Sequence, residues 1–192
     1  GDLPTYEIAD VTHGSGTELR KQIVVPRDSE DFRAGIIYGV NKGKPFGTVV
    51  HTVDIACIRP AAPDSFHKEV LMGLKKLDRG KLRFPGGFIN TTDASAEAAA
   101  RRELSEETGL WVNDLKYITN THINDWRYSG PNQRLFTTFY LAYHFAGVAK
   151  PGDDLDGVRW CSIDALRDEE VVSHHIVLLH ALKNLFRALG DL

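Results

Sequence analysis

Three glutamates lie close together in the stretch RELSEETGL, which runs from Arg102 to Leu110. Residues 94–107 contain neither Gly nor Pro and are rich in Ala, Arg, Glu and Leu, so they predict a helix. On this helix Glu103, Glu106 and Glu107 are three or four positions apart and share one face. Such charges repel each other, and the stretch offers too few Lys or Arg to neutralise them. A hard divalent cation, Mg²⁺ or Mn²⁺, would reverse the penalty because it takes oxygen ligands; the alternative is a solvated acidic face.

The segments that precede and follow the three glutamates indicate the elements that must position them. FPGGF at residues 84–88 predicts a strand end followed by a tight turn, because glycine accepts backbone angles that other residues resist. Asp93 and Ser95 can each cap the start of the helix, and Gly109 can end it. The sequence therefore predicts a glycine turn, a short polar loop and one acidic helix.

The complete pattern is Arg-Glu-apolar-any-Glu-Glu-any-Gly-apolar after a glycine turn, and it resembles the Nudix box of the Nudix hydrolases. One departure is visible, because the loop between Gly87 and Arg102 carries one residue more than the family pattern. The position of the first glutamate of the box, which usually supports the helix, falls on Ala94 with Asp93 beside it. We expect altered bracing of this loop and retained chemistry.

The composition is that of a water-soluble globular protein of ordinary make-up. The 192 residues are 42% hydrophobic and 26% charged, which is enough for one domain with a proper core. A net charge of −3 gives no general attraction to nucleic acid or anionic membranes, so we expect neither as a partner. No apolar run approaches about 18 residues, and no signal-peptide pattern opens the chain. Cys57 and Cys161 lie in apolar runs, which favours reduced core residues and a cytoplasmic location.

The order of predicted elements indicates an α/β fold. Residues 1–46 are expected to be a strand-rich, dimer-forming N-terminal extension, with a boundary at 41–45, and residues 47–192 the Nudix domain. We expect strands at 6–11, 22–26, 33–40, 48–58, 69–74, 81–84, 115–123, 135–146 and 157–161. A short helix is expected at 162–168, and an amphipathic closing helix at 173–189. This pattern predicts an α/β/α sandwich with a mixed sheet, which is also the Nudix fold. The closing-helix histidines read as surface or packing residues rather than ligands: His174, His175 and His180.

A second resemblance concerns the substrate. The segments NDWRY at 124–128, GDD at 152–154 and VRW at 158–160, together with FPGGF, are similar to ADP-ribose-hydrolysing Nudix domains. The similarity is to the Nudix half of bifunctional nicotinamide-mononucleotide adenylyltransferase/ADP-ribose pyrophosphatases and to the Nudix sensor half of NAD-linked transcription regulators. It extends from Thr48 to the C-terminus.

The residues of these segments suit a nucleotide diphosphate. Trp126 and Tyr128 could stack on adenine, and Arg127 or Arg134 could contact phosphate through fixed donors. The alternative is that both aromatic residues pack in the core and that the arginines pair with acidic neighbours: Asp125, Asp153 or Asp154.

The resemblance and the charge pattern assign roles within the box. Glu103 and Glu107 are expected to bridge metal ions, with Glu106 as third carboxylate and the carbonyl of Gly87 as a backbone ligand. Arg102 is expected to brace the carboxylates, as the resemblance implies. A general base is expected among three acidic residues of a later loop: Asp153, Asp154 and Asp156.

These observations predict metal-dependent hydrolysis of ADP-ribose, or a similar nucleoside diphosphate derivative, to AMP and ribose 5-phosphate. Mg²⁺ is the expected cofactor, and Mn²⁺ is an alternative. The competing hypotheses are a non-catalytic module that senses ADP-ribose or another nucleotide, and a hydrolase of nucleoside-diphosphate sugars, NADH or dNTPs. The β-branched stretches at 24–26 and 48–58 would leave an exposed strand edge, and the ADP-ribose pyrophosphatases that this chain resembles are commonly dimers. We therefore expect a two-fold homodimer.

Overall fold

The computed structural model describes residues 7–11, 20–24, 48–63 and 65–190, and the chain divides into two compact units, residues 1–48 and 49–192. In the first unit, β1 (Glu7–Val11) pairs antiparallel with β2 (Arg20–Val24). These strands confirm the expectations for 6–11 and, shifted by two residues, for 22–26. The strand expected at 33–40 and the boundary at 41–45 lie outside the described residues.

The second unit is built around one mixed sheet. Its strands run in the order β11-β4-β3-β9-β8, with β5 paired to β4 and β6 paired to β3. The bounds are β3 (Thr48–Pro60), β4 (Lys68–Leu74), β5 (Leu82–Arg83), β6 (Gly86–Phe88), β8 (Lys116–Ile123), β9 (Gln133–Ala142) and β11 (Gly157–Ser162). A two-stranded sheet pairs β7 (Trp111–Val112) with β10 (Phe145–Ala146). The single strand expected at 135–146 is therefore divided between β9 and β10.

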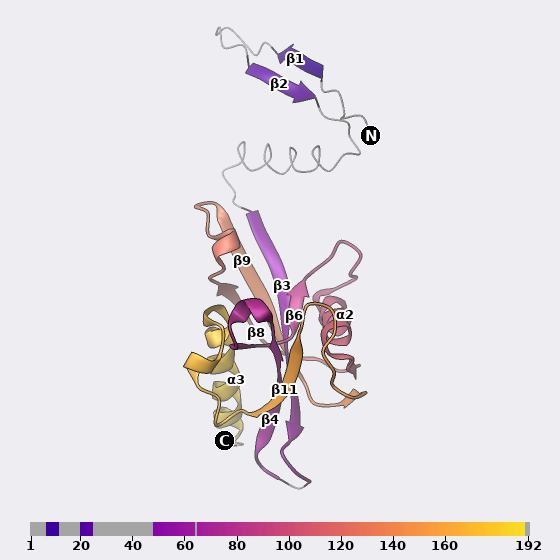
Figure 1. Cartoon of the computed structure of the whole chain (residues 1–192), viewed down its shortest axis with the longest axis vertical. Helices are drawn as coiled ribbons and strands as arrows, with labels where there is room; N and C mark the ends of the chain where they lie inside the picture. The colour runs from indigo at the N-terminus through magenta and orange to yellow at the C-terminus, as the bar shows by residue number, and fades with distance from the viewer. Residues whose placement is uncertain (1–6, 12–19, 25–47, 64, 191–192) are drawn as a thin grey trace. The chain divides into compact units, whose positions relative to one another are not determined.

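Two helices cover the sheet, with α2 (Ala96–Thr108) and α3 (Ile176–Leu189) on opposite sides of it (Figure 1). Alternation along β3 explains the two layers, since successive side chains of a strand point to opposite faces. Ala56 and Ile58 join the cluster that contains Leu178 and Leu182 of α3. The intervening residues of β3 join the cluster of α2: Val53, Ile55 and Cys57. The α/β sandwich with a mixed sheet is confirmed.

The ends of α2 follow local chemistry. Ser95 is the N-cap, and its hydroxyl accepts the N–H of Ala98 at 3.1 Å, so Asp93 is free for another contact. Gly109 ends the helix in the left-handed conformation with φ of 68°, as expected.

The prediction of a short helix at 162–168 is wrong. The N–H of Ile163 donates to the carbonyl of Lys68, so pairing with β4 continues past Ser162. Only one turn remains, closed by the Leu166 N–H on the Ser162 carbonyl, and it buries both Ile163 and Leu166. A helical 3-10 turn, η3 (Asp168–Glu170), follows instead.

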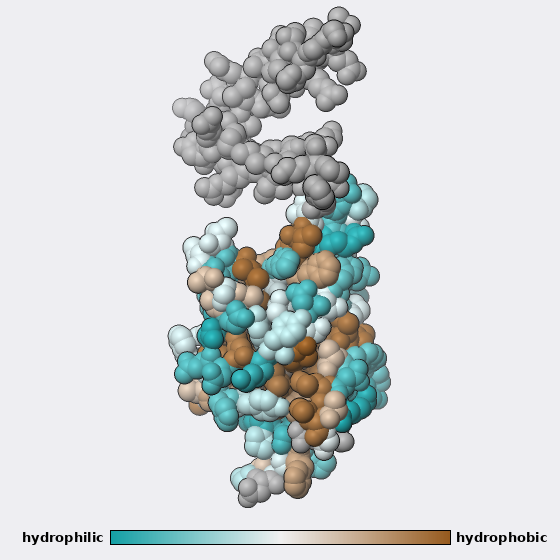
Figure 2. All heavy atoms as spheres, turned by 180° about the vertical axis from the view of Figure 1, so that it is seen from behind, coloured by the Kyte–Doolittle hydropathy of each residue, from teal (hydrophilic) through white to brown (hydrophobic). Residues whose placement is uncertain are grey.

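The remaining turns matter for the site. They are η1 (Lys76–Asp78), η2 (Trp126–Tyr128) and η4 (Ser173–His175), the last leading directly into α3. Apolar side chains form patches among hydrophilic ones on the face shown in Figure 2. The most exposed large apolar side chains include Leu77, Trp126 and Phe66. Within the described part of the chain, no helix has the length and apolar character needed to cross a membrane.

Candidate active site

The glycine turn brings the backbone into direct contact with the helix carboxylates. Strand β6 pairs with β3, so that Gly86 faces Asp54 and Gly87 faces Val53. Gly86 has a φ of 154°, and a Cβ there would lie 2.1 Å from the carbonyl oxygen of Val53. A Cβ on Gly87 would lie 2.5 Å from the carboxyl carbon of Glu103. Gly86 requires glycine because of its φ and the adjacent carbonyl, whereas the missing side chain of Gly87 leaves space for the Glu103 carboxylate against the main chain.

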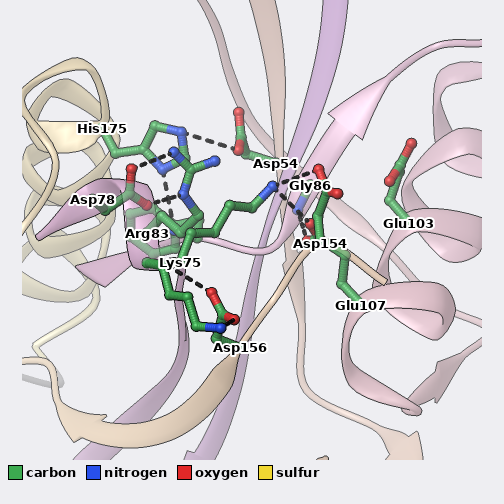
Figure 3. Close-up of polar contacts among 12 residues, drawn as sticks. Asp54, Lys75, Asp78, Arg83, Gly86, Glu103, Glu107, Asp154, Asp156 and His175 are labelled. Carbon is green, nitrogen blue, oxygen red and sulfur yellow. Dashed lines mark hydrogen bonds and ion pairs between the residues drawn. The ribbon is translucent and has the colours of Figure 1, made fainter. Parts of the chain in front are cut away.

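The three glutamates differ in burial. Glu107 is 2% exposed, its Oε2 accepts the Gly86 N–H at 2.9 Å, and its Oε1 lies 3.6 Å from the Lys75 Nζ (Figure 3). Burial raises the pKa of Glu107 to about 7. Glu103 is also buried, and desolvation raises its pKa, whereas Glu106 stays half exposed. The helix therefore presents two buried carboxylates and one at the solvent boundary.

Arg102 braces this face of the helix. Its Nη1 donates to Glu103 at 2.7 Å and to Glu106 at 3.0 Å, while its Nη2 donates to the carbonyl of Phe88 at 3.0 Å. Its Nε and Nη2 also donate to Asp93, whose pKa falls to about 2 because of these bonds. Asp93 in turn accepts the N–H of Asn90 at 2.7 Å. Asp93 thus ties the loop before α2 to Arg102.

Cations beside the carboxylates are more numerous than the acidic stretch suggests. Lys75, directly after β4, donates to Asp154 at 2.9 Å as well as approaching Glu107. Arg83, on β5, donates to Asp78 through Nε at 2.6 Å and Nη2 at 3.1 Å. The expectation that too few Lys and Arg lie near the glutamates is wrong, because the sheet brings these two from a different part of the sequence.

The acidic loop after β10 is fixed to the end of α2. The N–H of Gly152 donates to the carbonyl of Glu107 at 2.9 Å, which places the following residues beside the glutamates. Asp153 and Asp154 both border the hollow in front of α2. Asp156 instead accepts the backbone N–H of Lys76 at 2.7 Å and does not line that hollow. Of the expected general bases, the first two are therefore beside the site.

A buried polar group that the sequence analysis did not identify lies at the floor of the same hollow. Asp54 is 5% exposed; its Oδ2 accepts the hydroxyl of Thr137 at 2.6 Å, and its Oδ1 lies 3.5 Å from the Nε2 of His175. The Nδ1 of His175 accepts the N–H of Phe84 at 3.1 Å. Burial raises the pKa of Asp54 to about 7 and lowers that of His175 well below its usual range. His175 is thus neutral, with its proton on Nε2, toward Asp54.

The three histidines of the closing segment have separate positions. His175 is buried and also borders the hollow in front of α2, and His180 lies at the surface, 2.9 Å from Asp168. His174 borders the hollow in front of α2. A sequence signal for Asp54 did exist, because one acidic residue stands inside the apolar run TVDIACI.

Two hollows meet beside these residues. The carboxylate hollow, of about 380 Å³, is bordered by the three glutamates, Gly87 and Asp54. The tryptophan hollow, of about 830 Å³, is bordered by Trp126 and Asn124. Six residues line both: Lys75, Arg83, Asp125, Arg127, Asp154 and His174. A ligand can therefore extend from one hollow to the other past Lys75 and Arg83.

The four expected substrate residues separate into two pairs. Trp126 is 84% exposed and borders the tryptophan hollow, so the packing alternative does not hold for it. Arg127 lines both hollows and is paired with Asp125 at 2.7 Å. Tyr128 packs edge-on against Phe88, with ring centroids 5.9 Å apart, and Arg134 donates to the carbonyl of Gln133. Neither Tyr128 nor Arg134 borders either hollow.

The donor chemistry of the carboxylate hollow fits a hard divalent cation. Its oxygen donors come from Glu103, Glu106 and Glu107, and the absent side chain of Gly87 leaves room against its backbone. Over the described ranges, no three His, Cys, Asp or Glu side chains already form a metal-binding group. Arg102 pairs with Glu103 and Glu106, and Lys75 lies beside Glu107, so each of the three carboxylates already has a cationic neighbour.

A family model described as the NUDIX domain matches residues 58–182. The chain belongs to the Nudix family. Nudix proteins of this kind are hydrolases that act on small nucleotide substrates with the help of divalent metal ions. The match includes α2 and the residues that line both hollows, except Thr52 and Asp54 of the carboxylate hollow, which precede it.

Two curated relatives are similar to the chain. The U8 snoRNA-decapping enzyme of Xenopus laevis is 48% identical over 74 residues, 38% of this chain and 34% of that protein. The chain thus matches about a third of that relative's length. The oxidized purine nucleoside triphosphate hydrolase of Danio rerio is 29% identical over 123 residues, 63% of this chain and 76% of that protein.

Among solved structures, the NUDIX domain of Shewanella oneidensis NrtR complexed with ADP ribose has a TM-score of 0.59 at 19% identity, covering 78% of this chain and 97% of that one. A bifunctional NMN adenylyltransferase/ADP ribose pyrophosphatase from Francisella tularensis has a TM-score of 0.51 at 19% identity, covering 81% and 47%. At these identities the likeness establishes the shared Nudix fold.

Proposed function

We propose that this chain hydrolyses the diphosphate bond of ADP-ribose, or of a similar nucleoside diphosphate derivative, to AMP and ribose 5-phosphate, with Mg²⁺ as cofactor. The observation that carries the proposal is the position of Lys75 and Arg83 where the two hollows meet. A diphosphate with a bulky group at each end needs cations at its centre and space on both sides. The two hollows supply that space.

The chain's own residues bind and orient the diphosphate. Lys75 exchanges its partner Asp154, and Arg83 its partner Asp78, for phosphate oxygens. Phosphate is the stronger partner for both the compact ammonium charge of Lys75 and the planar guanidinium donors of Arg83. Glu103, Glu106, Glu107 and the Gly87 carbonyl would hold a divalent ion, which when bound would neutralise phosphate charge and activate the attacking water. Asp153 and Asp154 are the acidic side chains available to accept the proton of that water.

The adenine is proposed to stack on Trp126. Its indole is held at the start of η2, where the Asp125 carboxylate caps the turn by accepting the Arg127 N–H at 2.9 Å. Asp125 also binds the Arg127 side chain, and the Ser129 hydroxyl donates to the Trp126 carbonyl at 2.9 Å, so the backbone of η2 is held at both ends. An exposed indole on a turn whose backbone is held provides a stacking surface for a base.

A second candidate is hydrolysis of a nucleoside triphosphate, which the relative from Danio rerio favours. Such a substrate has a bulky nucleoside at one end and phosphate at the other. It would therefore place a bulky group in only one of the two hollows that meet at Lys75 and Arg83. A non-catalytic ADP-ribose sensor is less well supported, because a sensor has no need for all three glutamates and the glycine contact that seats Glu103.

A substrate panel distinguishes these functions. The purified chain is incubated with ADP-ribose, NADH, GDP-mannose, a dNTP and an oxidised purine nucleoside triphosphate, each with Mg²⁺ or Mn²⁺, and the products are separated by chromatography. The proposal predicts the highest kcat/KM for ADP-ribose, with AMP and ribose 5-phosphate in equal amounts. Faster release of pyrophosphate from a triphosphate would establish the second candidate. ADP-ribose binding without turnover of any compound would establish the sensor.

A further inference from the structure

We propose that Lys75 couples metal binding to substrate binding. In the metal-free protein its ammonium group neutralises Glu107, and in the loaded site the same group contacts the diphosphate. The inference rests on the proposed function, because it takes a divalent cation and a diphosphate as the two ligands.

Lys75 is positioned to serve both ligands. Its side chain is 17% exposed, and its Nζ lies 2.9 Å from Asp154 and 3.6 Å from Glu107 (Figure 3). The other oxygen of Glu107 is bonded to the Gly86 N–H. Both oxygens of this carboxylate are thus engaged, and the one facing Lys75 becomes available only when the ammonium group moves away.

Arg102 and Lys75 both neutralise glutamates, but they are held differently. Arg102 is anchored by Asp93 and by the Phe88 carbonyl on the side away from the glutamates. Lys75 has Asp154 as its other carboxylate partner, and that side chain is 71% exposed. An ammonium group on a four-carbon stem also moves more easily than a guanidinium that is hydrogen-bonded to four groups. Lys75 therefore moves away from its glutamate more easily than Arg102 does.

A divalent cation and Lys75 compete for the same oxygen of Glu107. The two positive charges repel each other across the buried carboxylate of Glu107, which makes the metal bind more weakly while the ammonium group remains. A diphosphate changes this balance, because Lys75 lines both hollows and can transfer to a phosphate oxygen. Each ligand thus raises the affinity for the other by the same factor, as linkage requires.

The test measures Mn²⁺ affinity by electron paramagnetic resonance, first without nucleotide and then with α,β-methylene ADP-ribose, which resists hydrolysis. Lys75→Met should bind Mn²⁺ alone about tenfold more tightly than the wild type, within the usual range of couplings. The analogue should tighten Mn²⁺ binding about tenfold in the wild type and little in Lys75→Met.

Two controls accompany this variant. Lys81→Met removes an equal charge from an exposed position and should behave as the wild type. Lys75→Arg keeps the charge and should restore weak Mn²⁺ binding, which a general loss of packing would not do. Thermal midpoints of all variants verify folding.

The outcomes separate the two proposals. Equal or weaker Mn²⁺ binding by Lys75→Met overturns the coupling role, even if ADP-ribose is hydrolysed. Tighter binding that the analogue no longer improves supports the coupling role, even if another diphosphate proves to be the better substrate. Failure of the wild type to bind Mn²⁺ under any condition overturns both.

Discussion

Raising the pH should destabilise the metal-free protein, and Asp54 should be the largest single cause. Its pKa is about 7 in the folded chain, against about 3.9 for an unfolded aspartate. The folded state therefore binds the proton more tightly, and the free energy of unfolding falls as the pH rises from about 4 to about 7. A difference of three pKa units corresponds to about 4 kcal/mol, since each unit is worth about 1.4 kcal/mol.

The measurement is chemical denaturation at pH 5 and pH 8 in the presence of a chelator. Asp54→Asn keeps the shape and can still accept the Thr137 hydroxyl, but it no longer titrates. Because pH 5 already lies above the pKa of an unfolded aspartate, only part of the 4 kcal/mol falls in this interval, and the variant should lose about 2.6 kcal/mol less stability than the wild type between the two pH values. The pKa of Glu107 is also raised to about 7, so the free energy of unfolding of the variant should still fall with rising pH, but less steeply than that of the wild type.

A matched control is Asp114→Asn, which changes an exposed aspartate and should keep the wild-type slope. Identical pH dependence of the wild type and Asp54→Asn would refute the reasoning. It would mean that Asp54 is solvated in solution and that the Asp54–His175 contact does not persist.

Three further predictions concern the site and the assembly. Trp126→Ala should raise the KM for ADP-ribose about 5- to 150-fold while changing stability by less than about 0.5 kcal/mol, because the indole is 84% exposed. The control Trp111→Ala lies outside both hollows and should change neither quantity. A large fall in the thermal midpoint of Trp126→Ala with an unaltered KM would contradict stacking. Glu107→Gln should lower turnover by several orders of magnitude, yet its midpoint in chelator at pH 8 should equal or exceed that of the wild type because a buried charge is removed; a clearly lower midpoint would argue against this. Light scattering at micromolar concentration should give twice the mass of one chain, and the mass of a single chain would exclude the expected homodimer.

The acidic helix could be predicted because its signals are local. A run of strong helix formers, a serine cap and a terminal glycine set the bounds of α2 within two residues. The spacing of Glu103, Glu106 and Glu107 then follows from helical geometry alone. The order of strands and helices likewise follows from hydrophobic patterning, which is why the sandwich was predictable.

The remainder of the site depends on pairing across the sheet. Lys75 lies after β4 and Arg83 on β5, and their approach to α2 follows from strand order rather than from any local motif. Asp54 and His175 are more than a hundred residues apart. The sequence contains each of these residues, but only the folded sheet shows which carboxylate each one faces.

The segment around Trp126 shows a further limit. Trp126 and Tyr128 are both aromatic and both suit stacking, so composition alone cannot separate them. In the three-residue turn η2, one side chain faces solvent and the other packs on Phe88. Short 3-10 turns rotate each residue by about a third of a circle, and tertiary contacts decide which one is buried.

The central claim is tested most directly by one time course of ADP-ribose hydrolysis. Wild type and Glu103→Gln are assayed in parallel in excess chelator and after addition of Mg²⁺ or Mn²⁺, with AMP and ribose 5-phosphate quantified. We predict equal release of both products by the wild type only after metal is added, and turnover lower by orders of magnitude in the variant. Undiminished hydrolysis in chelator, or near-normal turnover by Glu103→Gln, would contradict a metal-dependent site on α2.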